Sequence, residues 1–83
     1  MDQISSSTYR VLNYIIQYKR AAGGVSPTIR EICKGCSFHS TSQGRYHLLR
    51  LQELGLIERD PQRSRSIHLI GEQWFPSGEG FDA

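Results

Sequence analysis

The spacing of apolar residues near the start of the chain predicts an α-helix. We expect the helix to begin with Ser6 as its N-cap and to place an inward stripe at every third or fourth residue. This stripe consists of Tyr9, Leu12, Ile15, Ile16 and Lys19. The sequence AAGG at 21–24 should end the helix. The sequence VSP at 25–27 should run extended, because a residue before proline is disfavoured in the helical region.

Two short sequences have the form of a capping box, in which a Ser or Thr and the Glu or Gln three residues later bond each other's backbone N–H groups. The first is TIRE at 28–31, which predicts a short second helix that ends near residues 34–35. The second is STSQ at 40–43, which predicts a third helix with Ser40 as its N-cap. That helix should end at about Leu54, because Gly55 suits the left-handed conformation that terminates helices.

Two short alternating segments follow, LIER at 56–59 and SIHLI at 66–70, joined by the turn DPQRSR. They predict a β-hairpin with an arginine-rich loop. Three helices followed by a hairpin is the order of a winged helix-turn-helix, a mostly helical α+β fold whose later helix enters the DNA major groove. We expect this domain to occupy residues 1–70. Residues 71–83 should form a mobile tail, from which Trp74 and Phe75 are candidates to fold back.

The third helix divides into two faces when its residues are placed at about 100° intervals. One face should meet the core and contains Gly44, His47, Leu48, Leu51 and Leu54. The opposite face contains Ser42, Gln43, Tyr46, Leu49, Arg50 and Glu53. Gln43 suits adenine, Arg45 or Arg50 suits guanine or phosphate, and Leu49 suits a thymine methyl group. Gly44 costs up to about 1 kcal/mol relative to alanine, which suggests that another backbone approaches there.

Phosphate contacts are expected beside this face and in the hairpin. Ser40, Thr41 and Ser42 lie where the helix N-terminus attracts phosphate, and His39 could bond phosphate from just before the helix. Arg63 and Arg65 flank Ser64, so the hairpin could straddle phosphates or reach the minor groove. A solvated helix face and a solvated turn are the alternatives. The combination of polar face, helix order and arginine-bearing hairpin favours DNA.

The distribution of charge also favours a polyanionic partner. Residues 1–70 carry all ten Lys and Arg residues but five of the eight acidic residues, a net charge of +5. Eight of the ten basic residues are arginine, whose planar guanidinium suits phosphates and guanine edges. The N-terminus lacks the pattern of a signal peptide, and no apolar run approaches the roughly 20 residues that span a bilayer. We therefore expect a cytoplasmic protein with no membrane partner.

Both cysteines and two histidines lie within a short segment, which raises the question of a metal site. Cys33, Cys36, His39 and His47 could supply four ligands to tetrahedral zinc, but such sites usually take two pairs from separate segments. Reduced cysteine behaves as a small apolar residue, so packing is the favoured interpretation, and we expect no metal or other cofactor. Redox modulation of this turn remains open. His47 is expected to lean inward. No catalytic constellation is recognisable, so an enzyme is not expected.

The segment SPTIREICKGCSFHSTSQGRYHLLRLQELGLIERDPQRSRSIHLI, with the preceding LNYIIQY, resembles the N-terminal DNA-binding domain of the LexA family, the repressors of the SOS response. The resemblance covers about residues 6–70 without a gap. The matching pieces are Pro27-Thr28, Arg30-Glu31-Ile32, Ser40, His47-Leu48, Leu51, Gly55-Leu56-Ile57, Arg59-Asp60-Pro61, Arg63, Arg65 and Ile67.

The resemblance implies a bacterial or phage-encoded repressor of transcription that occupies double-stranded DNA, as a homodimer if its operator is palindromic. It implies contacts from Ser40, Thr41, Ser42, Gln43, Arg45, Tyr46, Arg63 and Arg65, to which we add Thr28, His39 and Arg50. The family's self-cleaving C-terminal domain has no counterpart here, so we expect an excised domain or a free-standing relative. Residues 43–46 depart from the family pattern, so the usual SOS operator is not carried over. The rival interpretation is a winged helix that docks a protein, such as a repressor or a polymerase.

Overall fold

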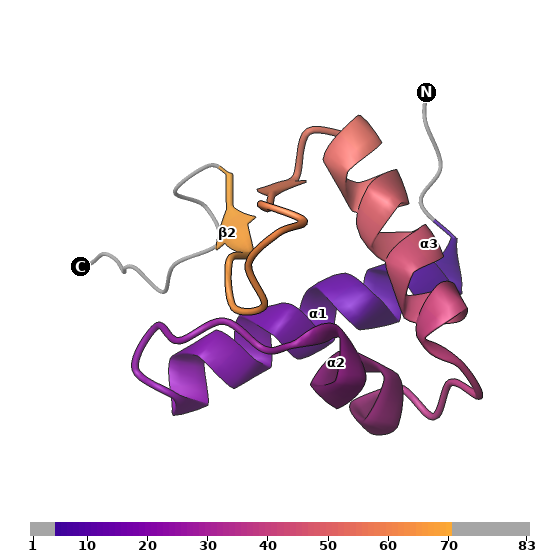
Figure 1. Ribbon diagram of the computed structural model, residues 1–83, viewed down its shortest axis with the longest axis horizontal. Coiled ribbons are helices and arrows are strands. Elements are labelled where there is room, and N and C mark those ends of the chain that lie inside the picture. Colours follow the sequence, from indigo (N-terminus) through magenta and orange to yellow (C-terminus); the bar gives the residue numbers. More distant parts are fainter. Residues whose placement is uncertain (1–4, 71–83) are drawn as a thin grey trace.

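The computed structural model describes residues 5–70, which form three helices and a two-stranded antiparallel sheet (Figure 1). The elements are α1 (Ser6–Ala21), α2 (Ile29–Gly35), α3 (Thr41–Glu53), β1 (Ile57–Glu58) and β2 (His68–Leu69). The predicted winged helix-turn-helix is therefore confirmed. The predicted tail at 71–83, with Trp74 and Phe75, lies outside the described residues, so the domain boundary at residue 70 stays a prediction. No helix within residues 5–70 is long and apolar enough to cross a membrane.

Helix α1 begins one residue earlier than predicted, and its buried stripe shares Leu12 and Ile15 with the predicted one. The N-cap is Ser5 rather than Ser6, since the Ser5 hydroxyl accepts a hydrogen bond from the Thr8 backbone N–H at 3.1 Å. The prediction that Tyr9 faces inward is wrong, because Tyr9 is 55% exposed. The buried residues of the helix are Thr8, Val11, Leu12 and Ile15. Thr8 can be buried because its hydroxyl is hydrogen-bonded, which offsets the cost of removing it from water.

The glycines at the end of α1 behave as the sequence predicts. Gly23 and Gly24 have positive φ angles of 67° and 96°, which strain most other residues, and the helix ends at Ala21. The following segment turns the chain back, so that α2 lies against α1 (Figure 1).

One of the two predicted capping boxes is present and the other is wrong. In α2 the Thr28 hydroxyl accepts from the Glu31 N–H at 3.1 Å, and the Thr28 N–H donates to the Glu31 carboxylate at 2.9 Å. In α3, Ser40 is the N-cap residue, but its side chain makes no capping hydrogen bond. The Gln43 side chain instead accepts from the backbone N–H of His39 at 2.7 Å, one residue too early for a capping box.

The core lies where α1, α2, α3 and the hairpin converge. It contains Val11, Leu12, Ile15, Ile32, Cys36, Leu48, Leu51, Ile57 and Ile67, all at most 3% exposed. Each large aliphatic side chain stabilises the fold by roughly 1.5–3 kcal/mol when it is fully buried. Because α3 contributes Leu48 and Leu51 to this core, its opposite side must face outward.

Helices α2 and α3 pack unusually closely at Gly44. A β-carbon at this position would lie 2.6 Å from the Cys33 sulfur, and the nearest backbone atom of the partner helix, the Ile29 carbonyl oxygen, would be 3.9 Å away. The expected close approach is therefore real, but the approaching group is a thiol rather than a backbone. The Cys33 thiol also donates to the Ser40 carbonyl oxygen at 3.4 Å, which joins α2 to the residue before α3.

Candidate nucleic-acid interface

The N-terminal half of α3 presents a row of exposed polar and aromatic side chains. Thr41, Ser42, Gln43, Arg45 and Tyr46 are all exposed, as are His39 and Ser40 just before the helix. Tyr46 is 58% exposed and Leu49 is 49% exposed. The structure thus brings the predicted contact residues of this segment onto one continuous surface, which we call the α3 face. We define the α3 face as residues 39–43, 45, 46 and 49.

The two sides predicted for α3 agree with the structure. Gly44, Leu48 and Leu51 are buried, and His47 and Leu54 are half-buried. His47 is oriented inward as predicted, because its Nδ1 lies 2.8 Å from the Thr8 hydroxyl and its ring stacks on Phe38 at a centroid distance of 5.2 Å. Burial lowers the pKa of His47, which favours the neutral ring.

Two side chains of the α3 face are held in place by neighbours. The Tyr46 ring meets His47 edge to face at a centroid distance of 5.0 Å, so the half-buried histidine supports the exposed tyrosine. The Gln43 carbonyl oxygen is occupied by the His39 N–H, which leaves its amide N–H groups as the outward donors. The backbone N–H groups of the first turn of α3 donate no hydrogen bond to the Ser40 side chain, and such uncapped groups attract anions.

Arg50 and Thr28 are less open than the other candidates. Arg50 donates to the Glu53 carboxylate at 2.9 Å, one helical turn away, in an ion pair that is largely exposed. Such pairs are weak in water, so Arg50 can exchange partners at little cost. Thr28 is half-buried, and its hydroxyl and N–H are both engaged in the cap of α2. Their roles in DNA binding stay predictions.

The arginines of the hairpin have different environments. Arg65 binds Glu31 through two guanidinium nitrogens, at 3.0 and 3.1 Å, and it also donates to the Ser26 carbonyl oxygen at 2.9 Å. The hydrogen bond from Arg65 is the largest cause that holds the pKa of the Glu31 carboxyl low, at about 2. Arg63 is exposed, and its guanidinium makes no ion pair or hydrogen bond with another residue of the 5–70 range.

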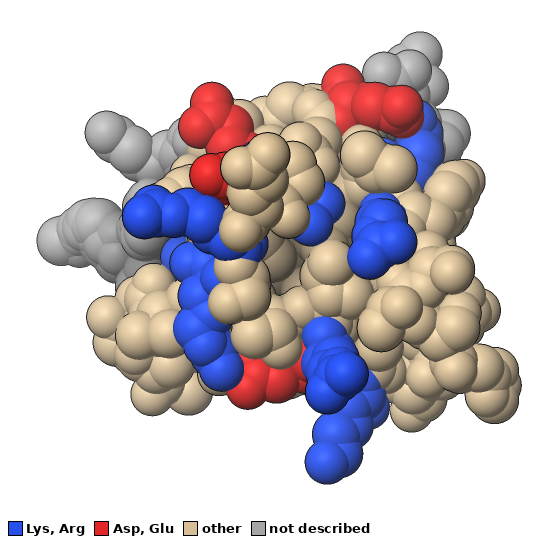
Figure 2. Space-filling model, in the orientation of Figure 1, with Lys and Arg blue, Asp and Glu red and all other residues tan. Residues whose placement is uncertain are grey.

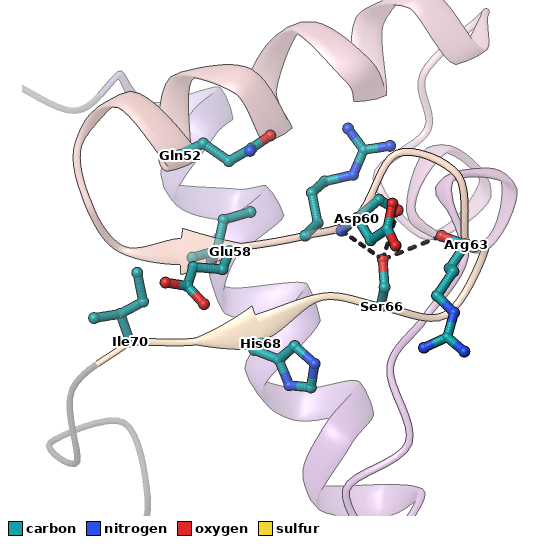
Figure 3. Close-up of a pocket in the computed structure, with 9 residues that line it drawn as sticks. Gln52, Glu58, Asp60, Arg63, Ser66, His68 and Ile70 are labelled. Carbon is teal, nitrogen blue, oxygen red and sulfur yellow. Dashed lines mark hydrogen bonds between the residues drawn. The ribbon is translucent and has the colours of Figure 1, made fainter.

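The hairpin loop is internally braced. The Ser66 hydroxyl accepts from the Asp60 N–H, and its single proton is shared between the carbonyl oxygens of Asp60 and Arg63, at 2.9 and 3.1 Å (Figure 3). The Asp60 carboxylate accepts from the Gln62 N–H at 2.9 Å. These bonds fix the loop that carries Arg63, and they were not predicted because they depend on the turn geometry.

A hollow of about 580 Å³ lies between the C-terminal part of α3 and the hairpin (Figure 3). Gln52 reaches toward it from α3, while Glu58 and His68 extend from the two strands. The hollow is lined by Gln52, Ile57, Glu58, Arg59, Asp60, Arg63, Ser66, His68 and Ile70. Arg59 was not among the predicted contact residues, although its place beside the arginine-rich hairpin loop was a signal.

Other basic residues stabilise the fold. Lys19 donates to the Ile67 carbonyl oxygen at 3.0 Å, and partial burial lowers its pKa. Arg10 donates to the Cys36 carbonyl oxygen at 2.6 Å, at the end of α2. Lys and Arg side chains occupy the left, centre and lower parts of the face drawn in Figure 2, and acidic side chains lie along its upper edge and between basic ones at its lower edge.

The cysteines are part of the packing between α2 and α3. Cys33 and Cys36 are 7% and 3% exposed, and both thiols are free. Burial raises the pKa of the Cys36 thiol, which disfavours the reactive thiolate. In the described part of the chain, no three His, Cys, Asp or Glu side chains are grouped so that they could hold a metal ion.

Comparison with known proteins gives a consistent result. The family model of the LexA DNA binding domain matches residues 1–66. The LexA repressor of Clostridium perfringens is 36% identical over 66 residues, which are 80% of this chain and 32% of that protein. The LexA repressor of Carboxydothermus hydrogenoformans is 34% identical over 70 residues, 84% of this chain and 34% of that protein.

A third relative has a higher identity over a shorter stretch. The LexA repressor of Clostridium botulinum is 43% identical over 61 residues, 72% of this chain and 29% of that protein. The chain therefore spans about a third of the length of the curated relatives that it matches.

Proposed function

The chain belongs to the LexA DNA-binding domain family, and from this membership we propose that it binds a specific sequence of double-stranded DNA and represses transcription there. The observation that carries the proposal is the α3 face, on which exposed hydrogen-bonding side chains gather at the N-terminal half of the helix. In helix-turn-helix proteins this part of the helix contacts base edges in the major groove. Repression then results from occupation of the operator and requires no chemical step.

The geometry supports a division of labour within the α3 face. The open N–H groups of the first helical turn, with Ser40, Thr41 and Ser42, would receive a phosphate and fix the depth of the helix. Gln43 and Tyr46 would read base edges, and Arg45 would contact a guanine edge or a phosphate. Because the Gln43 carbonyl oxygen is bonded to His39, Gln43 would present donors to acceptors such as guanine O6 or N7 or thymine O4, rather than pair with adenine through both groups.

We further propose that two copies act together on a palindromic or tandem site. One domain of this size contacts few base pairs, and a single module buries only about 600–1,000 Å² against DNA. Two half-sites spaced by about one helical turn would supply the missing affinity and specificity.

The most direct test is selection from a random duplex pool, followed by sequencing of the retained fraction and by salt titration on the selected duplex. The proposal expects an enriched motif and a linear fall of log K with log salt concentration. Retention of unrelated sequences, with no motif, would contradict it.

A protein-docking function is the second candidate, because Tyr46 and Leu49 expose apolar surface on the α3 face. The variants Arg45→Ala and Leu49→Ala separate the two functions. DNA binding should suffer more from Arg45→Ala, whereas an apolar protein contact should suffer more from Leu49→Ala.

A further inference from the structure

Arg59 lies outside the α3 face and lines the hollow between α3 and the hairpin. We infer that Arg59 contacts DNA and that, together with Arg45, it holds one backbone phosphate between α3 and the hairpin. This inference rests on the proposed DNA-binding function and adds to it a phosphate site and a residue that the sequence analysis did not assign.

The first support is helical geometry, which places Arg45 on the side of α3 that faces the hairpin and Arg59. Arg45, Leu49 and Gln52 lie on one stripe of α3. At about 100° per residue, their directions around the helix axis fall within roughly 60° of one another. Gln52, at the end of this stripe, lines the hollow opposite the hairpin. Arg59 lines the same hollow directly after β1, which packs against α3. Arg45 does not itself line the hollow, but this stripe places it on the side of α3 that faces the hairpin, about two turns before Gln52. We call the space between this side of α3 and the hairpin the trough.

The second support is the charge of the trough. Neither Arg45 nor Arg59 forms an ion pair or a side-chain hydrogen bond within residues 5–70. Partial burial lowers the pKa of Arg59, and the positive charge of Arg45 lowers it further, so the two guanidinium groups repel each other. An anion placed between them would relieve this repulsion.

The acidic groups near the trough do not supply that anion. Glu58 and Asp60 line the hollow, but neither forms an ion pair with an arginine in the described range. Asp60 is engaged with the Gln62 N–H of its own turn. His68 also lines the hollow and contributes no fixed negative charge.

A DNA phosphate is the anion that the arrangement fits. When a recognition helix enters the major groove and the wing rests on the adjacent backbone, a strand of DNA passes between them. Guanidinium groups match phosphate oxygens with paired hydrogen bonds. Arg65 is unsuited to this task in the observed conformation, because its guanidinium is bound to Glu31 and to the Ser26 carbonyl oxygen.

The test compares the variants Arg59→Ala, Arg59→Lys and Arg20→Ala on the selected duplex. Arg20 is an exposed arginine in the last turn of α1, which ends on the far side of the molecule from α3 (Figure 1), so it serves as the matched single-charge control. Arg59→Ala should weaken binding about tenfold and reduce the slope of log K against log salt by about one. Arg59→Lys should keep the slope and recover part of the affinity, and Arg20→Ala should change neither quantity.

A second measurement locates the phosphate and protects the test against a loss of fold. Duplexes that carry one uncharged methylphosphonate at each backbone position in turn are titrated with wild type, Arg59→Ala and Arg59→Lys, and folding of every variant is checked by urea denaturation. One position should weaken wild type and Arg59→Lys strongly and Arg59→Ala less, because only the alanine variant has already lost the contact of residue 59 with that phosphate. Equal affinity and slope for wild type and Arg59→Ala, or equal sensitivity of these two proteins at every position, would overturn the inference alone. Failure of wild type to select any duplex would overturn the proposed function and this inference with it.

Discussion

The helix-turn-helix unit and the hairpin are held in the fold by different combinations of interactions. Helices α2 and α3 are joined by apolar packing through Ile32 and Leu48 and by the close contact of Cys33 with Gly44. The hairpin also buries Ile57 and Ile67, and in addition it is tied to α1 and to the segment before α2 by hydrogen bonds that involve Lys19, Arg65 and Ser26. Packing leaves the polar side chains of α3 available for a ligand, whereas the hairpin uses part of its charge to hold its own position.

This difference explains why arginines that look alike in the sequence should differ in function. Arg45 and Arg63 carry charge that no described carboxylate neutralises. Arg65 makes four hydrogen bonds, to Glu31, Ser26 and Tyr18, and these orient the hairpin. Substitutions in the two regions should therefore separate loss of DNA affinity from loss of stability.

The largest effect is expected from Gly44→Val. The added side chain would overlap the Cys33 sulfur and force α2 and α3 apart, which should lower the free energy of unfolding by about 2–3 kcal/mol. Urea denaturation of Gly44→Val, Cys33→Ala and the double variant measures the coupling. Removal of the sulfur should recover part of the loss, and strictly additive losses would contradict the close contact.

Arg45→Ala should affect binding without affecting the fold. Affinity for the selected duplex should fall about 10- to 100-fold, because a phosphate or base contact is lost, while the unfolding free energy should change by less than about 0.5 kcal/mol. Fluorescence anisotropy and urea denaturation measure the two quantities. A variant that binds as wild type does would remove Arg45 from the α3 face as a contact residue.

In contrast to Arg45→Ala, which should leave the fold unchanged, Arg65→Ala should loosen the hairpin. Without the bonds to Glu31 and Ser26, the hairpin should open more often, so the Ile67 amide, which donates to the Ser26 hydroxyl, should exchange its hydrogen faster. Hydrogen exchange measured by NMR tests this. The amides of α3 should keep their protection, and unchanged exchange at Ile67 would show that apolar packing alone holds the hairpin.

The ion pair should also make stability depend on pH in an acidic window. The pKa of Glu31 is lowered from 4.5 to about 2, so its stabilising contribution is complete above about pH 4.5 and is lost as the pH falls toward 2. Thermal denaturation between pH 2 and 7 should show this loss in wild type and a flatter profile in Glu31→Gln. Identical profiles would mean that the ion pair does not stabilise the folded state.

The smallest effect concerns His47. Because burial lowers its pKa below 6.5, the folded protein binds a proton less readily than the unfolded chain, and a small part of stability is lost as the pH falls from above 6.5 toward the folded pKa. An NMR titration should give a midpoint below that of the same residue in urea. An equal or higher midpoint would contradict the buried position beside Thr8 and Phe38.

The sequence predicts the elements of the fold because local signals specify them. The glycines at 23, 24 and 55 end helices where expected, and the TIRE capping box begins α2 as expected. Predictions that depended on a single residue were less accurate. The N-cap of α1 is Ser5 rather than Ser6, because either serine can accept from the N–H groups at the start of the helix. Gln43 accepts from His39 rather than from Ser40, because its side chain is long enough to reach the residue before the N-cap.

The candidate site was only partly predictable. Helical periodicity gives the outward side of α3, so most of the α3 face could be predicted from the sequence. Periodicity cannot show which arginines are neutralised by residues far along the chain, and the pairing of Arg65 with Glu31 joins positions 34 residues apart. The same limitation explains why Arg59 was missed: its proximity to Arg45 arises only when the hairpin folds beside α3.

In the proposed complex the α3 face reads the DNA sequence, whereas the hairpin binds the DNA backbone. Duplex selection carried out in parallel with wild type, Gln43→Ala and Arg63→Ala tests this division most directly. We predict that Gln43→Ala relaxes the preference at one base pair of each half-site, whereas Arg63→Ala selects the wild-type motif with weaker overall affinity and a smaller salt dependence. An unchanged motif for Gln43→Ala, or a motif altered by Arg63→Ala, would contradict the account.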